Sequence, residues 1–215
     1  MMGIFEAIGD LLFPPKCMFC QKILRSSRSQ ICPECDKALT RADAVRTGTY
    51  FSRCAVAMSY EGKVKDAIVR YKFQDRSNYA KELGRILARC IQDNLRGEYN
   101  LITWIPVSPE RLRQRGYDQA MLLAMAAALE LDDVAVATLE KTSNNAAQSS
   151  LTDAAQRLEN VKDAYRVCAP EIVEGKRILL IDDVITTGAT MDEAGRTLLE
   201  AGAAEVFGAA LAQPV

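Results

Sequence analysis

One stretch near the C-terminus constrains the fold more than any other, because an apolar strand runs there into two acids, a small hydroxyl-rich turn and a helix. Residues 177–182 form the strand, and residues 186–190 form the turn. Apolar positions at spacings of three and four follow over 191–201 and end at Gly202, as in an amphipathic helix. Backbone N–H groups at the start of such a helix, reinforced by the helix dipole, bind anions. The stretch therefore predicts a strand–turn–helix unit with an anion site at its turn.

The polar residues of this stretch suggest the chemistry of the bound anion. They are accompanied by two small residues, and together the set is Asp182, Asp183, Thr186, Thr187, Gly188, Ala189 and Thr190. The threonine hydroxyls can donate to one phosphate, and the glycine and alanine are too small to block its approach. Two adjacent carboxylates suit a polyhydroxylated sugar, because each accepts hydrogen bonds from hydroxyls and one can reach Mg²⁺ directly or through water. The pattern predicts a sugar-phosphate site.

An ordinary turn, in which Asp and Thr only cap the helix, is the alternative. A cap needs one such residue, whereas five polar positions converge here. A Walker-type phosphate loop is excluded, because Gly-Lys-Ser or Gly-Lys-Thr is missing. Ligand crevices of open α/β sheets lie at the carboxyl ends of the strands, so we expect Asp182 and Asp183 to stay solvated on the crevice rim until a ligand arrives. Their replacement by asparagine should then change stability little.

The remaining sequence alternates strand-length apolar runs with amphipathic segments. Strands are expected over 54–59, 101–107, 134–139 and 205–212, and helices are expected after residue 62, over 78–96 and over 117–130. Residues 141–156 are polar and lie between two strand candidates, which favours a long mobile loop. Strands that alternate with helices predict an α/β fold with a mainly parallel sheet and helices on both faces.

Seven cysteines and no histidine limit the metal chemistry of the chain. Four of the cysteines form two C-x2-C pairs with eleven residues between them, namely Cys17, Cys20, Cys32 and Cys35. Such pairs can present four sulfurs tetrahedrally, so we expect a closed, structural Zn²⁺ site that folds a segment too short to bury a core alone. A redox pair is the alternative, but it needs one C-x2-C at a helix start within a βαβ unit. The others lie in apolar or strand-like contexts and are expected in the core: Cys54, Cys90 and Cys168.

The domain boundary is expected near residue 50, with an N-terminal helix and the zinc ribbon over 1–50 and the α/β domain over 51–215. Residues 16–53 carry eight Lys or Arg against three acids, but zinc-bound thiolates offset part of this charge, which favours a solvated zinc-ribbon surface over a nucleic-acid patch. Glu6 and Asp10 lie where a signal peptide has basic residues, and no apolar run approaches the roughly 18 residues of a membrane span. We therefore expect a cytoplasmic location without membrane insertion.

The strand, acids and turn resemble the phosphoribosyl pyrophosphate (PRPP) motif of the type I phosphoribosyltransferases. The resemblance implies that fold, with catalytic Asp182 and Asp183 facing the ribose hydroxyls, residues 186–190 around the 5′-phosphate, and Mg²⁺ on the pyrophosphate. Further blocks resemble the ComF family, amidophosphoribosyltransferase-like proteins associated with bacterial competence and DNA uptake. These blocks are the cysteine ribbon, Tyr71-Lys72-Phe73, Ile105-Pro106-Val107, Arg115-Gly116-Tyr117-Asp118-Gln119-Ala120, and the series Gln148, Leu151, Arg157, Asn160 and Tyr165. Two positions depart from the family pattern, since Ser108 replaces a common proline and Asp118 a common asparagine.

Basic and polar residues outside the motif are candidates for the pyrophosphate side of the site. Arg111, Arg113 and Arg115 follow a strand end and can meet pyrophosphate or an acidic substrate, or they form a solvated helix start. Lys72 either faces the site or belongs to the end of an amphipathic helix. By resemblance to amidophosphoribosyltransferases, residues 141–160 are a hood that closes over PRPP, and the alternative is an untethered surface loop. The hood candidates are Lys141, Gln148, Arg157 and Asn160.

Two functions from different classes fit this sequence. An enzyme would transfer the 5-phosphoribosyl group of PRPP to a nitrogen nucleophile on a small or nucleobase-like acceptor and release pyrophosphate. The missing histidine is no obstacle, because positioning, carboxylates and Mg²⁺ can support such a displacement. The alternative is a non-catalytic PRPP-sensing or DNA-uptake module whose ribbon docks to a competence protein or to single-stranded DNA. The sequence leaves the acceptor and the oligomeric state open, a homo-oligomer included.

Overall fold

The sheet at the centre of the molecule is mainly parallel, as predicted. The computed structural model describes residues 14–26, 29–39, 41–142 and 163–214. In them a five-stranded sheet has the order β1-β2-β7-β6-β3. Its strands are β1 (Arg41–Arg46), β2 (Cys54–Ser59), β3 (Leu101–Trp104), β6 (Arg177–Val184) and β7 (Glu205–Gln213). Only β1 runs antiparallel to its neighbour within this sheet, so the other four strands point their carboxyl ends the same way.

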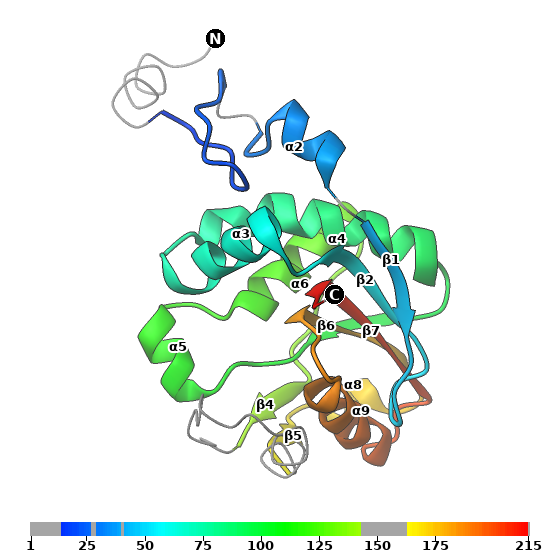
Figure 1. The fold of residues 1–215 in the computed structure, drawn as a ribbon. Coiled ribbons are helices and arrows are strands. Elements are labelled where there is room, and N and C mark those ends of the chain that lie inside the picture. Colours follow the sequence, from blue (N-terminus) through cyan, green and yellow to red (C-terminus); the bar gives the residue numbers. More distant parts are fainter. Residues whose placement is uncertain (1–13, 27–28, 40, 143–162, 215) are drawn as a thin grey trace.

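Helices cover both faces of the sheet (Figure 1). The helices α3 (Gly62–Phe73), α4 (Ala80–Leu95) and α6 (Gln119–Glu130) lie on one face, and α8 (Pro170–Val173) and α9 (Ala189–Glu200) lie on the other. Alternation along the buried strand β6 separates the two cores. Leu179 and Ile181 pack with α4 and α6, whereas Ile178 and Leu180 pack with α9. This double burial explains why the strand is continuously apolar.

The remaining elements are short. A short antiparallel pair, β4 (Leu139–Lys141) and β5 (Tyr165–Val167), lies apart from the main sheet. The zinc-ribbon segment contributes α2 (Pro33–Ala38) and lies over α3 and α4 (Figure 1). The helix α5 (Pro109–Arg115) joins β3 to α6. None of the helices in the described ranges has the length and hydropathy required to cross a bilayer.

Several boundaries differ from the sequence-based expectations for local reasons. The helix expected over 117–130 starts at Gln119, because the side chain of Asp118 caps it by accepting from the N–H of Met121. The expected strand at 134–139 is reduced to a bridge at Ala135 followed by β4. The boundary near residue 50 stays a prediction, although β1 places residues 41–46 in the main sheet.

The expectation that three cysteines lie in the core holds for Cys54 and in part for Cys90. Cys54 is fully buried in β2, and Cys90 is half-buried on α4 and packs against the core. Cys168 is exposed, and its assignment to the core was wrong, because it directly follows the short strand β5 outside the main sheet.

Candidate functional site

The two predicted acids lie side by side where β6 ends. Asp182 accepts a hydrogen bond from the backbone N–H of Asp183 at 2.7 Å through its Oδ1. The strand β6 is hydrogen-bonded to β3 on one side and β7 on the other, so its carboxyl end is flanked by neighbouring strands on both sides. In open α/β sheets the carboxyl ends of the strands are where ligands bind.

Lys72 lies in this site and pairs with Asp183. The distance from Lys72 Nζ to Asp183 Oδ1 is 2.8 Å, and the two side chains are only 17% and 12% exposed. Lys72 belongs to the last turn of α3, so the end of this helix places its ammonium beside the acids. The expectation that both carboxylates stay solvated is therefore wrong, because Asp183 is buried and already has a charged partner.

The environment of Asp182 disfavours its charge. Burial and, next, the neighbouring Asp183 carboxylate raise the pKa of Asp182 to about 7, whereas Lys72 and Lys141 oppose this rise. The two adjacent acids therefore have different roles at neutral pH. Asp183 carries the ion pair with Lys72, and Asp182 can hold a proton.

The turn after β6 has the geometry of an anion cradle. Gly188 adopts a left-handed conformation, with φ of 89°, and no side chain caps the start of α9 at this residue. The hydroxyl of Thr187 accepts from the N–H of Ala189 at 3.3 Å, and Thr186 and Thr187 are exposed. Thr190 is half-buried in the first turn of α9. Backbone N–H groups and hydroxyls thus lie together at a helix N-terminus, a place where anions can bind.

A second wall of the crevice follows β3. Ser108 caps α5 by accepting from the N–H of Arg111 at 3.3 Å. Asp118 holds this connection together, because Oδ2 accepts from the N–H of Val107 and Oδ1 from that of Met121, both at 3.0 Å. Burial raises the pKa of Asp118, and these backbone donors oppose the rise. An aspartate at this position therefore has an evident role in fixing residues 107–118.

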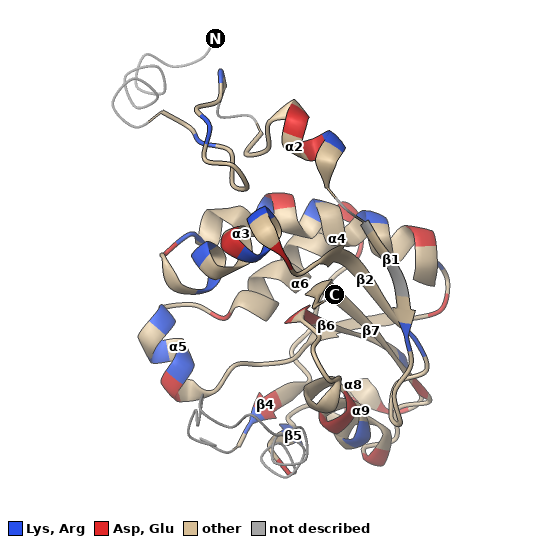
Figure 2. Ribbon diagram, viewed as in Figure 1, with Lys and Arg blue, Asp and Glu red and all other residues tan. Residues whose placement is uncertain are grey.

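The three arginines of α5 differ in their surroundings. Arg111 and Arg113 are exposed, and basic residues dominate this helix in Figure 2. Arg115 is half-buried, donates to Gln119 Oε1 at 2.8 Å, and lies 4.6 Å from the ring centroid of Phe73. Together with Lys72, the last part of α5 lines a surface pocket of about 480 Å³. The structure therefore brings Lys72 near Arg113 and Arg115, beside the acids.

The β4–β5 pair contributes a further cation. Lys141 Nζ lies 3.4 Å from the hydroxyl of Tyr165 and 5.1 Å from the centroid of its ring. Burial and then the charge of Arg111 lower the pKa of Lys141. Burial also raises the pKa of Tyr165, with Asp182 contributing. Lys141 and Tyr165 therefore lie within electrostatic reach of the acid pair, whereas Gln148, Arg157 and Asn160 lie outside the described residues.

Sequence reasoning overlooked one residue that contacts the turn. Arg46, the last residue of β1, donates from Nη1 to the backbone carbonyl of Thr186. The contact spans 140 positions, and no local pattern around Arg46 indicates it. Only the order of strands in the sheet brings the two residues together.

The four ribbon cysteines form a separate site that fits one zinc ion. Their Sγ atoms lie within 4.8 Å of one another. The Cys20 and Cys32 sulfurs are 3.7 Å apart, and four sulfurs at about 2.3 Å from zinc would be about 3.8 Å apart in a tetrahedron. The backbone N–H of Cys32 donates to Cys17 Sγ and that of Cys35 to Cys32 Sγ, both at 3.4 Å. Such donors stabilise thiolates, so the four residues would hold a structural zinc.

The ribbon is anchored to the α/β domain by partly buried polar contacts. Arg70 of α3 donates to the carbonyl oxygens of Met18 at 2.8 Å and Phe19 at 3.1 Å. Glu82 of α4 is buried, accepts from the N–H of Gln30 at 3.3 Å, and pairs with Arg85 at 2.9 Å. The segment between Cys17 and Cys20, which we call the first knuckle, is therefore fixed on α3, the helix that carries Lys72.

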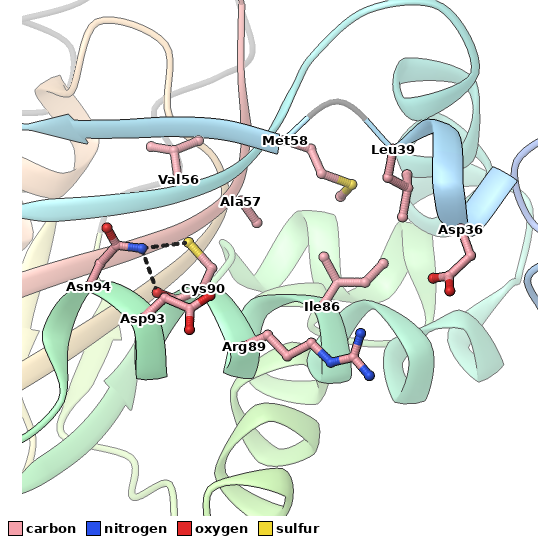
Figure 3. Close-up of a pocket in the computed structure, with 10 residues that line it drawn as sticks. All are labelled: Asp36, Leu39, Val56, Ala57, Met58, Ile86, Arg89, Cys90, Asp93 and Asn94. Atoms are coloured by element: carbon pink, nitrogen blue, oxygen red, sulfur yellow. Dashed lines mark hydrogen bonds between the residues drawn. The ribbon is translucent and has the colours of Figure 1, made fainter.

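A second hollow lies between α4, β2 and α2, away from the predicted site residues. It is a cavity of about 130 Å³ with Val56, Met58 and Ile86 among its apolar walls (Figure 3). Asn94 borders it and donates to the carbonyl oxygen of Cys90 at 2.8 Å. Within the described ranges, no residue predicted to bind sugar, phosphate or metal lines this cavity. The cavity is therefore separate from the candidate site at the carboxyl ends of the strands.

Comparison with known proteins supports both parts of this architecture. Residues 115–214 match the family model "Phosphoribosyl transferase domain", and residues 8–67 match "Double zinc ribbon domain". The competence protein ComFC of Streptococcus pneumoniae is 32% identical over 204 residues, which cover 94% of this chain and 80% of that protein. The DNA utilization protein YhgH of Escherichia coli K12 is 29% identical over 203 residues, covering 88% of this chain and 86% of that protein.

A solved structure was also found similar. The glutamine PRPP amidotransferase from B. subtilis, complexed with ADP and GMP, has a TM-score of 0.45 and 22% identity to this chain. The match covers 66% of this chain and 30% of the length of that chain.

Proposed function

The chain belongs to the ComF family, and from this premise we propose that it binds Mg²⁺–PRPP and transfers the phosphoribosyl group to a nitrogen nucleophile. In this proposal Asp182 and Asp183 accept hydrogen bonds from the ribose hydroxyls, and residues 186–190 bind the 5′-phosphate. The reaction serves DNA uptake, as the names of the relatives suggest. The acceptor is a small or nucleobase-like molecule.

One observation carries the proposal. Two adjacent carboxylates near the end of β6, which has a strand on each side, are followed at residue 186 by a hydroxyl-rich turn that leads into α9. A ribose 5-phosphate unit joins sugar hydroxyls and a phosphate in one ligand. Capping accounts for the hydroxyl of Thr187, which accepts from the N–H of Ala189, but it explains neither the second acid nor the exposed hydroxyl of Thr186.

Ligand binding would require Asp183 to change partners. The carboxylate now pairs with Lys72, and a bound ribose would offer it hydroxyl donors instead. Lys72 would then be free to meet the pyrophosphate, together with Arg111, Arg113 and Arg115 from α5. Carboxylate oxygens are also the ligands that Mg²⁺ prefers, so the acid pair fits this ion.

The chemical step needs little from the protein beyond position and charge. The bond from the anomeric carbon to pyrophosphate breaks, a bond to the acceptor nitrogen forms, and the nitrogen loses its proton to water. Positive charge develops on the sugar during the displacement, and the nearby carboxylates stabilise it. When bound, Mg²⁺ would supply charge that favours departure of pyrophosphate.

Calorimetric titration with Mg²⁺ and PRPP tests the binding site. We expect Asp182→Asn and Asp183→Asn each to weaken PRPP binding about ten- to a hundredfold, since a lost charge-assisted hydrogen bond costs roughly 1.5–3 kcal/mol. Asp66→Asn, on the exposed face of α3, is the control and should bind PRPP like the wild type. Wild-type affinity in both site variants would refute the ribose assignment, provided that thermal melts show them folded.

A second function is favoured by the names of the relatives, which describe competence and DNA utilization rather than a transferase. In that case the protein binds PRPP without turnover, and the ribbon docks to a protein partner or to single-stranded DNA. Release of pyrophosphate from PRPP, measured across a panel of nitrogenous acceptors, separates the two functions. Binding without release from any acceptor would favour the accessory role.

A further inference from the structure

The connection from β1 to β2 packs against the start of α9. The backbone N–H of Tyr50 donates to Asp192 Oδ1 at 2.8 Å, and Asp192 lies in the first turn of α9. A Cβ built on Gly195 would approach the carbonyl oxygen of Tyr50 to 2.5 Å, so glycine permits this close contact. The ring of Phe51 lies 3.8 Å from a Cβ built on Gly188. Residues 46–51, which we call the β1 clasp, therefore lie beside the phosphate turn.

Arg46 begins the β1 clasp and brings a cation to the turn. Its position is fixed by the pairing of β1 with β2, in which Arg46 lies opposite Cys54. Its side chain is half-buried, and Nη1 donates to the carbonyl oxygen of Thr186. A guanidinium has five N–H donors in a rigid fork, so one bond to a carbonyl leaves further donors for an anion.

The charges around Arg46 favour an anionic ligand. In the part of the chain that the structure describes, the Arg46 guanidinium forms no ion pair with a carboxylate. Asp192, the acid in the first turn of α9, accepts from the backbone of Tyr50 instead. A cation, a helix N-terminus and the exposed hydroxyls of Thr186 and Thr187 thus lie together. Each of these features attracts a phosphate.

We propose that Arg46 is a further phosphate ligand, which binds the 5′-phosphate of the sugar phosphate held at residues 186–190. This inference rests on the proposed function and adds a residue to its site. The guanidinium would form charge-assisted hydrogen bonds to phosphate oxygens while it keeps the carbonyl of Thr186 in place. Lys72 and the α5 arginines would serve the pyrophosphate.

The rival explanation is that Arg46 only fixes the backbone of the turn. Ligands that occupy different halves of the site separate the two roles. Ribose 5-phosphate contains the 5′-phosphate without pyrophosphate, and Mg²⁺–pyrophosphate contains only the opposite end. A phosphate ligand should affect the first and not the second, and its loss should leave amide exchange at residues 186–190 of the ligand-free protein unchanged, whereas a role in fixing the turn should make that exchange faster.

The experiment is calorimetric titration of the wild type, Arg46→Gln and Arg46→Lys with PRPP, ribose 5-phosphate and Mg²⁺–pyrophosphate. Arg46→Gln should bind PRPP and ribose 5-phosphate about tenfold more weakly or worse, with pyrophosphate binding unchanged. Arg46→Lys keeps the charge but loses the fork, so its affinity should lie between those of the other two proteins. Arg53→Gln is the control, because Arg53 also donates to a backbone carbonyl, that of Asn94 at 2.8 Å, without contacting the turn.

The outcomes distinguish this inference from the proposed function. Wild-type binding of all three ligands by Arg46→Gln would overturn the role of Arg46 and leave the PRPP site standing. An equal loss for ribose 5-phosphate and pyrophosphate, or faster amide exchange at residues 186–190 in ligand-free Arg46→Gln, would also overturn it, in favour of a structural role. A wild-type protein that binds no PRPP would refute the proposed function and the assignment of Arg46 together. If Arg46→Gln does not fold, Arg46→Lys decides by the same comparison of ligands.

Discussion

At the scale of single residues, the neighbouring acids Asp182 and Asp183 should respond differently to the same substitution. Asp183→Asn removes the partner of Lys72, whose ammonium then lies in a site where it is only 17% exposed. We expect the free energy of unfolding to fall by about 1–3 kcal/mol, the range for a buried polar group left unpaired. Urea denaturation measures this loss, and the double variant Lys72→Met with Asp183→Asn should recover part of it. A single variant as stable as the wild type would show that the ion pair contributes nothing.

Asp182 should instead show a pH dependence. Its pKa in the folded protein is about 7, raised from 3.8, so the folded state binds a proton more tightly than the unfolded chain does. The stability that this protonation provides is present below about pH 4 and is lost as the pH rises towards 7. Asp182→Asn lacks this loss, so its melting temperature relative to the wild type should rise between pH 4 and 7. A difference in melting temperature between variant and wild type that stays constant from pH 4 to 7 would contradict the burial of the charge.

At the scale of elements, α3 connects the zinc ribbon, the α5–α6 connection and the acid pair through three consecutive residues. Arg70 binds the first knuckle, Tyr71 donates to the carbonyl oxygen of Gln119 at 2.8 Å, and Lys72 pairs with Asp183. The hydroxyl of Tyr117 donates in return to the carbonyl oxygen of Tyr71. The end of this helix therefore fixes the geometry of the site from several sides.

Arg70→Ala should loosen the ribbon without removing its zinc. The variant leaves the carbonyl oxygens of Met18 and Phe19 without the guanidinium, which should cost about 1–3 kcal/mol of stability. Amide exchange should become faster over residues 17–35, while elemental analysis still finds one zinc per chain. Lys65→Ala, at an exposed position of the same helix, is the control and should change neither. Unchanged exchange in Arg70→Ala would mean that apolar packing alone holds the ribbon.

The elements that the sequence predicted well are those set by local patterns. The strand expected over 177–182 is β6, which its continuous apolar run predicts. The helix expected over 191–201 is α9, which the apolar spacing and the glycine at 202 predict. The helix α5 was expected only as an alternative, a helix start at Arg111, Arg113 and Arg115, although a serine followed by proline at 108 and 109 is a helix start signal. The Lys72–Asp183 pair and the Arg46–Thr186 contact could not be predicted, because both depend on where helices and strands pack.

At the scale of the whole molecule, the ribbon and the α/β domain share one hydrophobic core. Ribbon residues Cys17, Met18 and Ile31 belong to the same buried cluster as residues of α3, α4 and β7. The cysteine spacing predicted the zinc site, but it gave no sign that the site would be continuous with the main core. Loss of zinc should therefore lower the stability of the α/β domain as well as that of the ribbon.

Cys32→Ser tests this continuity. Cys32 Sγ lies 3.7 Å from that of Cys20 and also accepts from the N–H of Cys35, so its loss should abolish high-affinity zinc binding. Because the binding energy of a structural zinc is folding energy, about 10–16 kcal/mol in zinc-finger peptides, the ribbon should unfold. Its removal would expose the apolar faces of α3 and α4, and the melting temperature of the α/β domain should fall with it.

The control is Cys168→Ser, which replaces an exposed cysteine outside the cluster. It should keep one zinc per chain and the wild-type melting temperature. Elemental analysis and calorimetric melting of both variants make the comparison, and PRPP titration adds a functional measure, since a loosened α3 would also release Lys72 from Asp183. A Cys32→Ser protein that loses zinc but melts like the wild type would show that the ribbon folds independently. Undiminished zinc in Cys32→Ser would instead refute the four-cysteine site itself.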